Sequence, residues 1–175
     1  MSASGSPAAR LALLANGLIV AGGGAAIAVA WGFQLIGGYS PCKLCLEQRV
    51  PYYVGLPLGL AALALLLTRR YGLAAVLLVL VALVFAYGAG LGVYQAGAEW
   101  QFWAGPSDCG GGSGAPSSAA NMLQALQSAR VVSCTEASWR LLGLSFAGWN
   151  VVASGGVAVL ALIAAVLSRK AKKEA

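Results

Sequence analysis

Four long apolar stretches constrain the fold of this chain more than any other feature. They cover residues 11–31, 51–68, 71–93 and 147–167, and each is close to the ~20 residues that a helix needs to cross a bilayer. Only 9% of the 175 residues are charged, which is too few to cover the surface of a soluble domain of this size. We therefore predict an all-α membrane protein, a four-transmembrane-helix bundle that forms one polytopic domain over residues 1–175. Its two larger loops are expected at about 32–50 and 94–146.

The basic residues predict the orientation of this bundle. Seven Lys and Arg residues flank the spans on one side, where Glu174 is the only acidic residue. Because positive residues mark the cytoplasmic side, both termini are predicted to be cytoplasmic and both larger loops periplasmic, in a bacterial inner membrane. The net charge of +6 is thus an orientation signal, and no basic cluster with an aromatic platform indicates nucleic-acid binding. The seven residues are Arg10, Arg69, Arg70, Arg169, Lys170, Lys172 and Lys173.

All four cysteines fall in the predicted periplasmic loops, Cys42 and Cys45 in the first and Cys109 and Cys134 in the second. The even number and the oxidising compartment favour disulfide chemistry, either structural or redox-active. A metal site is disfavoured, because the chain has no histidine and 24 residues separate the second pair. We predict no metal.

The spacing of Cys42 and Cys45 favours a redox role for that pair. A disulfide across two intervening residues closes a very small ring, gains little loop-closure entropy and makes a poor structural cross-link. The same spacing lets one sulfur resolve a mixed disulfide formed at the other.

Arg49 follows Cys45 by four residues, at the start of the second span. If a helix begins at the CxxC motif, Cys45 lies in its first turn, where free N–H groups and the helix dipole favour a thiolate. Arg49 then lies on the same face, where it can stabilise that thiolate or negative charge on a reduced quinone oxygen. The alternative is an ordinary interfacial arginine, which would run against the charge bias of this side. We predict Arg49 and Cys45 as the acceptor-binding residues.

The two loops differ in length, which suggests a division of labour. The short first loop holds Cys42 and Cys45 near the membrane, within reach of a lipid-soluble acceptor. The long second loop, with its glycine-rich segment at 110–114, can reach a soluble protein. A short helix is predicted over 117–130, either lying on the membrane surface or packed on the bundle.

Small and aromatic residues in the spans have structural explanations. Glycines at 22–24, at Gly88 and Gly92, and at 155–156 predict close helix approach. Trp31, Trp100, Trp103 and Trp149 lie near span ends, as interfacial aromatic residues do, although some of them could line a quinone pocket.

Several motifs together resemble one known family. The general ones are the four spans, the CxxC before the second span, the arginine after it and the cysteine pair in the long loop. The more specific ones are Tyr94 and Glu99-Trp100 ahead of Gly105-Pro106 and Cys109, and Cys134-Thr135-Glu136 followed by Trp139 and Leu142-Gly143-Leu144. Over most of its length the chain thus resembles the disulfide bond formation protein B (DsbB) family of quinone-linked membrane thiol oxidases.

That resemblance implies a complete electron path. A reduced periplasmic thioredoxin-like oxidase (DsbA-like) would attack Cys109 of a Cys109–Cys134 disulfide. The electrons would pass to the Cys42–Cys45 pair, and Cys45 would donate them to ubiquinone, or menaquinone, from the membrane pool near Arg49.

One position departs from the family pattern. The best-known member carries a histidine near the end of the third span, where this chain has Gln95, and the chain has no histidine at all. A histidine-based proton route is therefore excluded. Glu47, Glu99 or water could substitute, and the sequence does not choose among them.

Two alternatives remain at this point. A vitamin K epoxide reductase-like protein is also a quinone-linked bundle with two cysteine pairs, but its loop cysteines precede its CxxC, the reverse of the order found here. A non-enzymatic tetraspan protein would use the cysteines as structural disulfides only.

Overall fold

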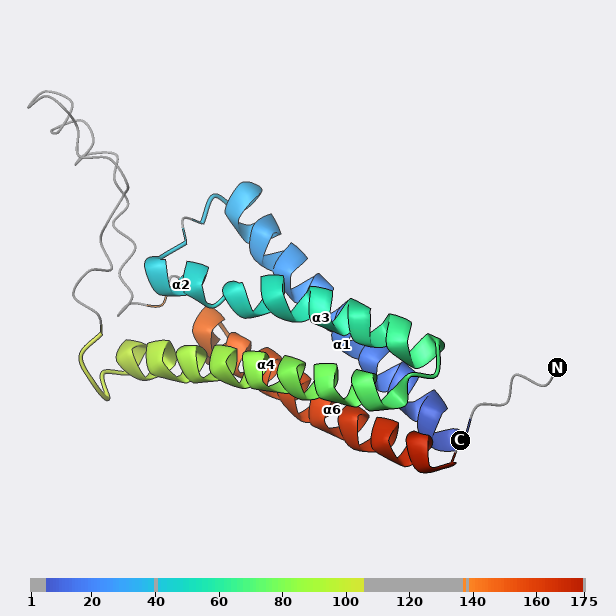
Figure 1. Ribbon diagram of the computed structural model, residues 1–175. Coiled ribbons are helices and arrows are strands. Elements are labelled where there is room, and N and C mark those ends of the chain that lie inside the picture. The colour runs from blue at the N-terminus through green and yellow to red at the C-terminus, as the bar shows by residue number, and fades with distance from the viewer. Residues whose placement is uncertain (1–5, 40, 106–136, 138, 175) are drawn as a thin grey trace, which may run out of the picture.

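The computed structural model describes residues 6–39, 41–105, 137 and 139–174. Its four long helices lie side by side as one bundle (Figure 1). They are α1 (Pro7–Leu35), α3 (Val50–Leu67), α4 (Tyr71–Glu99) and α6 (Phe146–Glu174), and a short helix, α2 (Lys43–Glu47), precedes α3. The four candidate spans, one of them formed by α2 and α3 together, are long and apolar enough to cross a membrane, which confirms the predicted all-α four-helix bundle. The helix predicted over 117–130 lies outside the described residues.

Three of the helices extend beyond the predicted spans. At 1.5 Å per residue, a helix of 29 residues is about 43 Å long, whereas the hydrocarbon core is only ~30 Å thick. Most relevant is α4, which continues past Val93 and ends at Glu99. Polar residues beyond the hydrocarbon core do not interrupt a helix, so the end of the apolar run underestimated its length. Gln95 and Glu99, expected in a loop, are therefore helical.

Glycine brings α4 against its neighbours at two positions. A Cβ added to Gly92 would lie 2.8 Å from Val151 Cγ2 and 3.1 Å from the Ala147 carbonyl oxygen of α6. A Cβ on Gly88 would lie 2.9 Å from Pro51 Cγ of α3. The predicted close approach is thus found at these two glycines, and also at Gly23 of α1, where an added Cβ would lie 3.0 Å from Leu56 Cδ2 of α3. By contrast, a Cβ at 22, 24, 155 or 156 would meet no described atom within 4 Å outside its own helical turn.

Helix α1 belongs to the core over only part of its length. Its buried residues begin at Ala8 and end at Gly23. From there α1 diverges from α4 and α6 toward the end of the bundle that carries α2 (Figure 1). Side chains of this second half, from Ala26 to Gln34, line a cavity.

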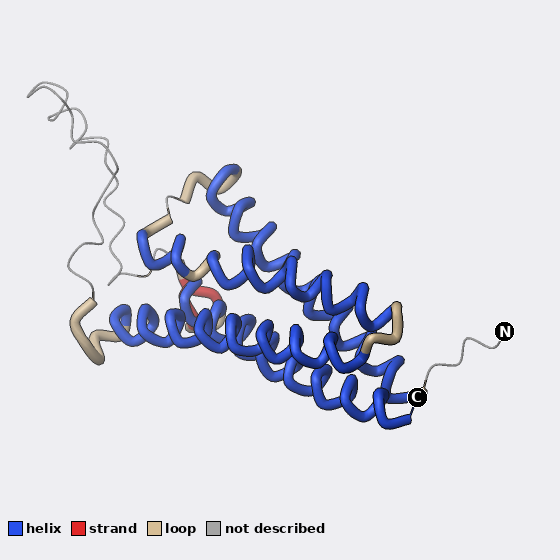
Figure 2. The backbone as a smooth tube through the Cα atoms, in the orientation of Figure 1, coloured by secondary structure: helices blue, strands red, loops and turns tan. Residues whose placement is uncertain are grey.

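A two-stranded hairpin leads into α6. Strands β1 (Arg140–Leu141) and β2 (Leu144–Ser145) are antiparallel and joined by Leu142 and Gly143, whose φ angles are 53° and 84° (Figure 2). Two positive φ angles are typical of a type I′ turn, which explains the glycine. Ser145 Oγ accepts a 3.2 Å hydrogen bond from the Gly148 N–H and caps the first turn of α6.

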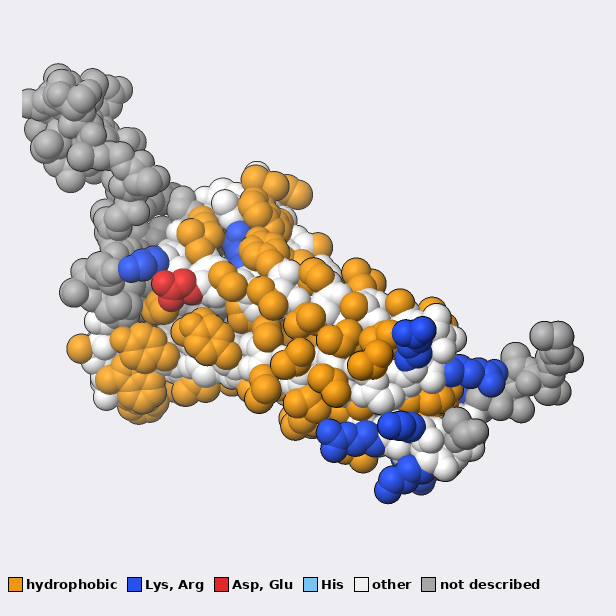
Figure 3. Space-filling view, viewed as in Figure 1, with side chains coloured by type: hydrophobic (Ala, Val, Ile, Leu, Met, Phe, Trp, Pro, Cys, Tyr) orange, Lys and Arg blue, Asp and Glu red, His pale blue; other side chains and the backbone are white. Residues whose placement is uncertain are grey.

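The two ends of the bundle differ in charge. Lys and Arg side chains gather at the end where α6 terminates and α3 joins α4 (Figure 3). The opposite end carries α2 and the hairpin (Figures 1 and 2). The orientation predicted from this charge bias, with the α2 end periplasmic, stays a prediction.

Candidate active site

Cys42 and Cys45 form a disulfide, with their Cα atoms 5.0 Å apart. Cys42 is the N-cap of α2, and its Sγ accepts a hydrogen bond from the Cys45 N–H at 3.1 Å. Cys45 lies in the first turn of this helix, as the sequence predicted. Cys42 is buried, whereas Cys45 is partly exposed. The two sulfurs of the pair therefore differ in accessibility.

We had expected Cys45 and Arg49 to lie in one continuous helix, but they do not. Helix α2 ends at Glu47, and Arg49 is the N-cap of α3. Pro51 explains the break, because it has no N–H to continue the hydrogen-bond ladder from α2. The resulting turn at Gln48 and Arg49 still directs both of their side chains into the same cavity as Cys45.

The Arg49 side chain is held by α1. Its Nη1 donates to Gln34 Oε1 at 2.6 Å, and its Nη2 donates to the Ala30 carbonyl oxygen at 3.4 Å. The guanidinium carbon lies 5.3 Å from the ring centroid of Trp31, a cation–π contact. Arg49 is 9% exposed, so it does not extend into solvent as an ordinary interfacial arginine would.

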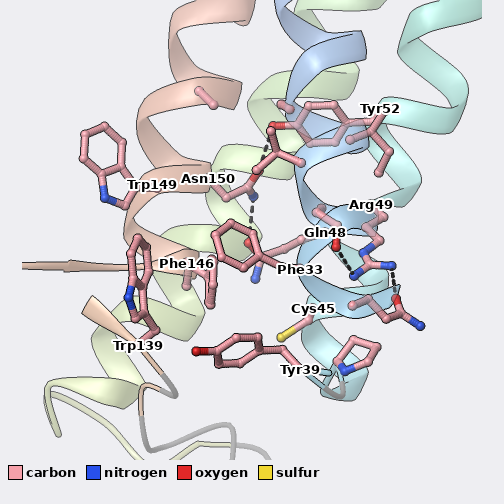
Figure 4. A pocket seen from close by; sticks show the side chains of 18 of the residues that line it. Phe33, Tyr39, Cys45, Gln48, Arg49, Tyr52, Trp139, Phe146, Trp149 and Asn150 are labelled. Carbon is pink, nitrogen blue, oxygen red and sulfur yellow. Dashed lines mark hydrogen bonds between the residues drawn. The ribbon is translucent and has the colours of Figure 1, made fainter. Parts of the chain in front are cut away.

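A cavity of about 510 Å³ lies beside this end of α3, between the diverging half of α1, the α2–α3 turn and the start of α6. Its surface is mainly apolar and aromatic. Figure 4 shows Cys45, Gln48 and Arg49 along one wall, and Trp139, Phe146, Trp149 and Asn150 along the other.

The aromatic side chains of the cavity wall, Phe33, Trp139 and Phe146, pack against one another. Trp139 stacks on Phe146 with their ring centroids 5.1 Å apart, and Phe33 of α1 meets Phe146 edge to face at 5.0 Å. The hairpin supports this wall, because the Leu141 carbonyl accepts a hydrogen bond from Trp149 Nε1 at 3.1 Å. Trp139 of the sequence motif thus lines the cavity, and the Leu142-Gly143-Leu144 motif forms the hairpin turn behind it.

A chain of amide side chains crosses the site from α4 to α6. Gln48 Nε2 donates to Gln95 Oε1 at 2.6 Å, and Asn150 Nδ2 donates to Gln48 Oε1 at 2.7 Å. Tyr52 OH continues the chain by donating to Asn150 Oδ1 at 2.9 Å. Each donor meets an acceptor, so the orientation of every amide is defined by its neighbours.

Gln95 connects this chain to the disulfide. Its Nε2 lies 3.8 Å from Cys45 Sγ and donates to Glu99 Oε1 at 3.2 Å, and its Oε1 lies 4.0 Å from Cys42 Sγ. Gln95 is 5% exposed and lines the cavity. Gln95, noted in the sequence for the absence of a histidine, is therefore in contact with both sulfurs.

The cavity thus brings together Cys45 and Arg49, the predicted acceptor-binding residues. Cys109 and Cys134 lie outside the described residues. The sequence did not assign Gln48, Asn150, Trp139 or Phe146 to the site. Of the four tryptophans considered above for a quinone pocket, Trp149 lines the cavity. Asn150 offered a signal, since a polar side chain within a predicted span faces the bundle interior and is commonly functional.

Comparison with known proteins identifies the family. No curated protein and no solved structure matched the chain. The family model described as disulfide bond formation protein DsbB matches residues 12–164, which include all four cysteines and most of each long helix. The match decides between the two quinone-linked families considered above. With four membrane-spanning helices and a disulfide beside a buried arginine, the chain belongs to the DsbB family of multi-pass bacterial inner-membrane disulfide-bond formation proteins.

Proposed function

We propose that this protein re-oxidises a periplasmic DsbA-like thiol oxidase and passes the electrons through Cys109 and Cys134, then Cys42 and Cys45, to a membrane quinone. The observation that carries the proposal is the position of Cys45, which borders the 510 Å³ cavity together with the buried Arg49. A disulfide that served only as a cross-link would have no reason to border an apolar cavity that also holds a cation.

The residues around the cavity fit a quinone. The volume falls within the ~300–1,000 Å³ of typical small-molecule sites, and aromatic side chains dominate the walls. Arg49 has five N–H donors, of which Gln34 and Ala30 take two. The second hydrogen of Gln48 Nε2 is a further donor at the same end. A flat apolar ring with two carbonyl oxygens matches this combination, and once bound it would accept two electrons and two protons.

Arg49 is suited to stabilise negative charge in this cavity. Its contacts with Gln34, Ala30 and Trp31 fix the guanidinium before any ligand binds. A fixed cation in an apolar site stabilises a developing anion without the cost of reorganisation. The charge can act on the Cys45 thiolate or on an oxygen of the acceptor.

The two sulfurs of the CxxC motif divide the reaction. Cys45 lines the cavity and Cys42 does not, so Cys45 is the sulfur that meets the acceptor. Cys42, buried as the N-cap of α2, resolves the exchange with the loop cysteines. The roles of Cys109 and Cys134, the DsbA-like partner and the periplasmic side follow from the family and from the charge bias of the sequence.

Partner-dependent quinone reduction tests the proposal. The protein, purified in detergent, is mixed with a reduced DsbA-like partner and ubiquinone or menaquinone, and quinone absorbance is followed. The wild type should turn over, whereas Cys45→Ser and Cys109→Ser should each fall to the rate without enzyme. Thr68→Val, at the opposite end of α3, is the matched control and should keep the wild-type rate. A wild type that reduces neither quinone would overturn the proposal and favour the structural-disulfide alternative.

A further inference from the structure

The carboxyl group of Glu99 lies near the disulfide, and the side chain of Gln95 contacts both. Its Oε1 accepts a hydrogen bond from Gln95 Nε2 at 3.2 Å, and the same nitrogen lies 3.8 Å from Cys45 Sγ. Gln95 and Glu99 are separated by one turn of α4, so the helix itself fixes their relative positions. The carboxylate and the redox sulfur thus meet at one amide group.

The other carboxyl oxygen, Glu99 Oε2, is buried and has no hydrogen-bond partner among the described residues. A buried polar atom without a partner is costly, so its presence calls for a physical explanation. The lone pairs of Oε2 can accept a proton without breaking any hydrogen bond within the described part of the chain.

Reduction of the disulfide would create a second negative charge at this place. Two adjacent anions in a partly buried site repel each other, so one of them takes up a proton. Within the described part of the chain, the other charged residues at this end are Lys43 and Glu47 of α2, Arg140 of β1 and Arg49, whose guanidinium is bound to α1. Of Glu47 and Glu99, the carboxyl groups described at this end, Glu99 is the one that accepts a hydrogen bond from Gln95.

We propose that Glu99 carries the redox-linked proton of the Cys42–Cys45 pair, in the role that a histidine could have filled. When the partner's dithiol reduces the S–S bond, the bonding pair stays on Cys45 as a thiolate, and Cys42 becomes a thiol with one of the two protons that the dithiol gives up. Glu99 binds one proton from solution, forming an O–H bond at Oε2. When the pair is re-oxidised by the quinone, two electrons leave the sulfurs, the S–S bond re-forms, and the protons of Glu99 and Cys42 complete the reduced quinone. Gln95 is the positioning residue that holds Glu99 beside the sulfur. This inference rests on the proposed function.

Infrared difference spectroscopy on quinone-free protein tests the inference without turnover. The spectrum of the chemically reduced protein is compared with that of the disulfide form. In wild type, reduction should produce the C=O stretching band of a protonated carboxyl group, shifted in D₂O. Glu99→Gln should lack this band, while Glu47→Gln, the matched control in α2, should keep it. A wild-type spectrum without the band, or a band that persists in Glu99→Gln, would overturn the inference.

Turnover gives a second, independent readout. Glu99→Gln keeps an oxygen that can accept from Gln95 but cannot bind the proton, so quinone reduction should slow by about 100-fold, the usual size of general acid–base effects. In Glu99→Ala, added formate or acetate should restore part of the rate, which a purely structural residue would not allow.

The outcomes separate this inference from the proposed function. An active wild type with an unchanged Glu99→Gln rate removes Glu99 and leaves the proposed function intact. An inactive wild type removes the proposed function itself. Thermal unfolding is measured for both Glu99 variants, and loss of the folded bundle in both would overturn the inference, because Glu99 would then be a structural residue.

Discussion

Asn150 Nδ2 donates a 2.7 Å hydrogen bond to Gln48 Oε1, and this bond joins α6 to the turn that carries Arg49. The two residues are 102 positions apart in the chain. Gln48 is 6% exposed, so its oxygen has little access to a replacement partner. The turn that carries Arg49 is thus fixed to the opposite wall of the cavity by a buried polar contact.

Replacing Asn150 by leucine should destabilise the bundle. Asn150→Leu keeps the size of the side chain but leaves Gln48 Oε1 and Tyr52 OH without this partner. A buried group left unsatisfied costs about 1–3 kcal/mol, and we expect a loss of that size in the free energy of unfolding. Titration with SDS, followed by tryptophan fluorescence, measures it. Thr68→Val removes only exposed hydrogen bonds at the end of α3 and should change stability by less than about 0.5 kcal/mol. Equal stability of the two variants would contradict the prediction.

Arg49→Lys should weaken quinone binding although it keeps the charge. A lysine cannot donate to Gln34 and Ala30 in the same geometry or lie flat on Trp31. We expect the KM for quinone to rise by about tenfold, the factor given by the loss of one hydrogen bond to a charged group. The measurement is quinone reduction at varied quinone concentration. Arg140→Lys, at an exposed arginine of β1, is the control and should leave the KM unchanged. If the KM of Arg49→Lys is the same as that of Arg140→Lys, the hydrogen-bonded geometry of Arg49 has no part in quinone binding.

Filling the cavity should block the acceptor without changing any polar group. Ala153 lines the cavity, whereas its neighbour Val152 is 54% exposed on the outer face of α6. Ala153→Phe should raise the KM for quinone at least about tenfold, since a phenyl group occupies space needed by the ring. Reduction of Cys42–Cys45 by the partner should proceed as before. Val152→Phe adds a phenyl group facing outward and should leave KM unchanged, and a similar KM in the two variants would argue against binding in this cavity.

The proposed direction of electron flow predicts where the partner attaches. A DsbA-like partner that lacks its resolving cysteine should be trapped as a mixed disulfide with Cys109, because the second loop is the part predicted to meet soluble proteins. Non-reducing electrophoresis and peptide mass spectrometry identify the linked residue. Cys109→Ser should abolish the adduct, and Cys45→Ser should preserve it. Capture at Cys42 instead would reverse the proposed order of the two pairs.

The sequence predicted those parts of the molecule that depend on local pattern. The four helices follow from apolar length, and the place of Cys45 in a first helical turn follows from its position just before the second span. The predicted helix ends were less accurate. Gln95 and Glu99 continue α4, because polar residues outside the hydrocarbon core are compatible with a helix. Only the tertiary structure shows where the chain turns.

The contacts of the site could not be predicted, because they join distant segments. The amide chain brings together Gln48, Gln95 and Asn150, and no local spacing relates them. Arg49 was assigned to Cys45 through a continuous helix, yet Pro51 interrupts that helix and the two residues meet at the cavity instead. The residue types indicated which side chains belong to the site, but only the fold shows which of them contact one another.

The divergence of α1 after Gly23 determines how an oxidant would arrive. In the proposed orientation, the widening wedge between α1 and α6 lies at the depth of the outer leaflet, with Val29 and Trp149 on its two sides. A hydrophobic acceptor would enter sideways, by diffusion within the bilayer, and would not need to leave the lipid phase. Electron acceptors dissolved only in water would then be poor substrates even when they are strong oxidants, so membrane partitioning would govern which compounds this protein can use.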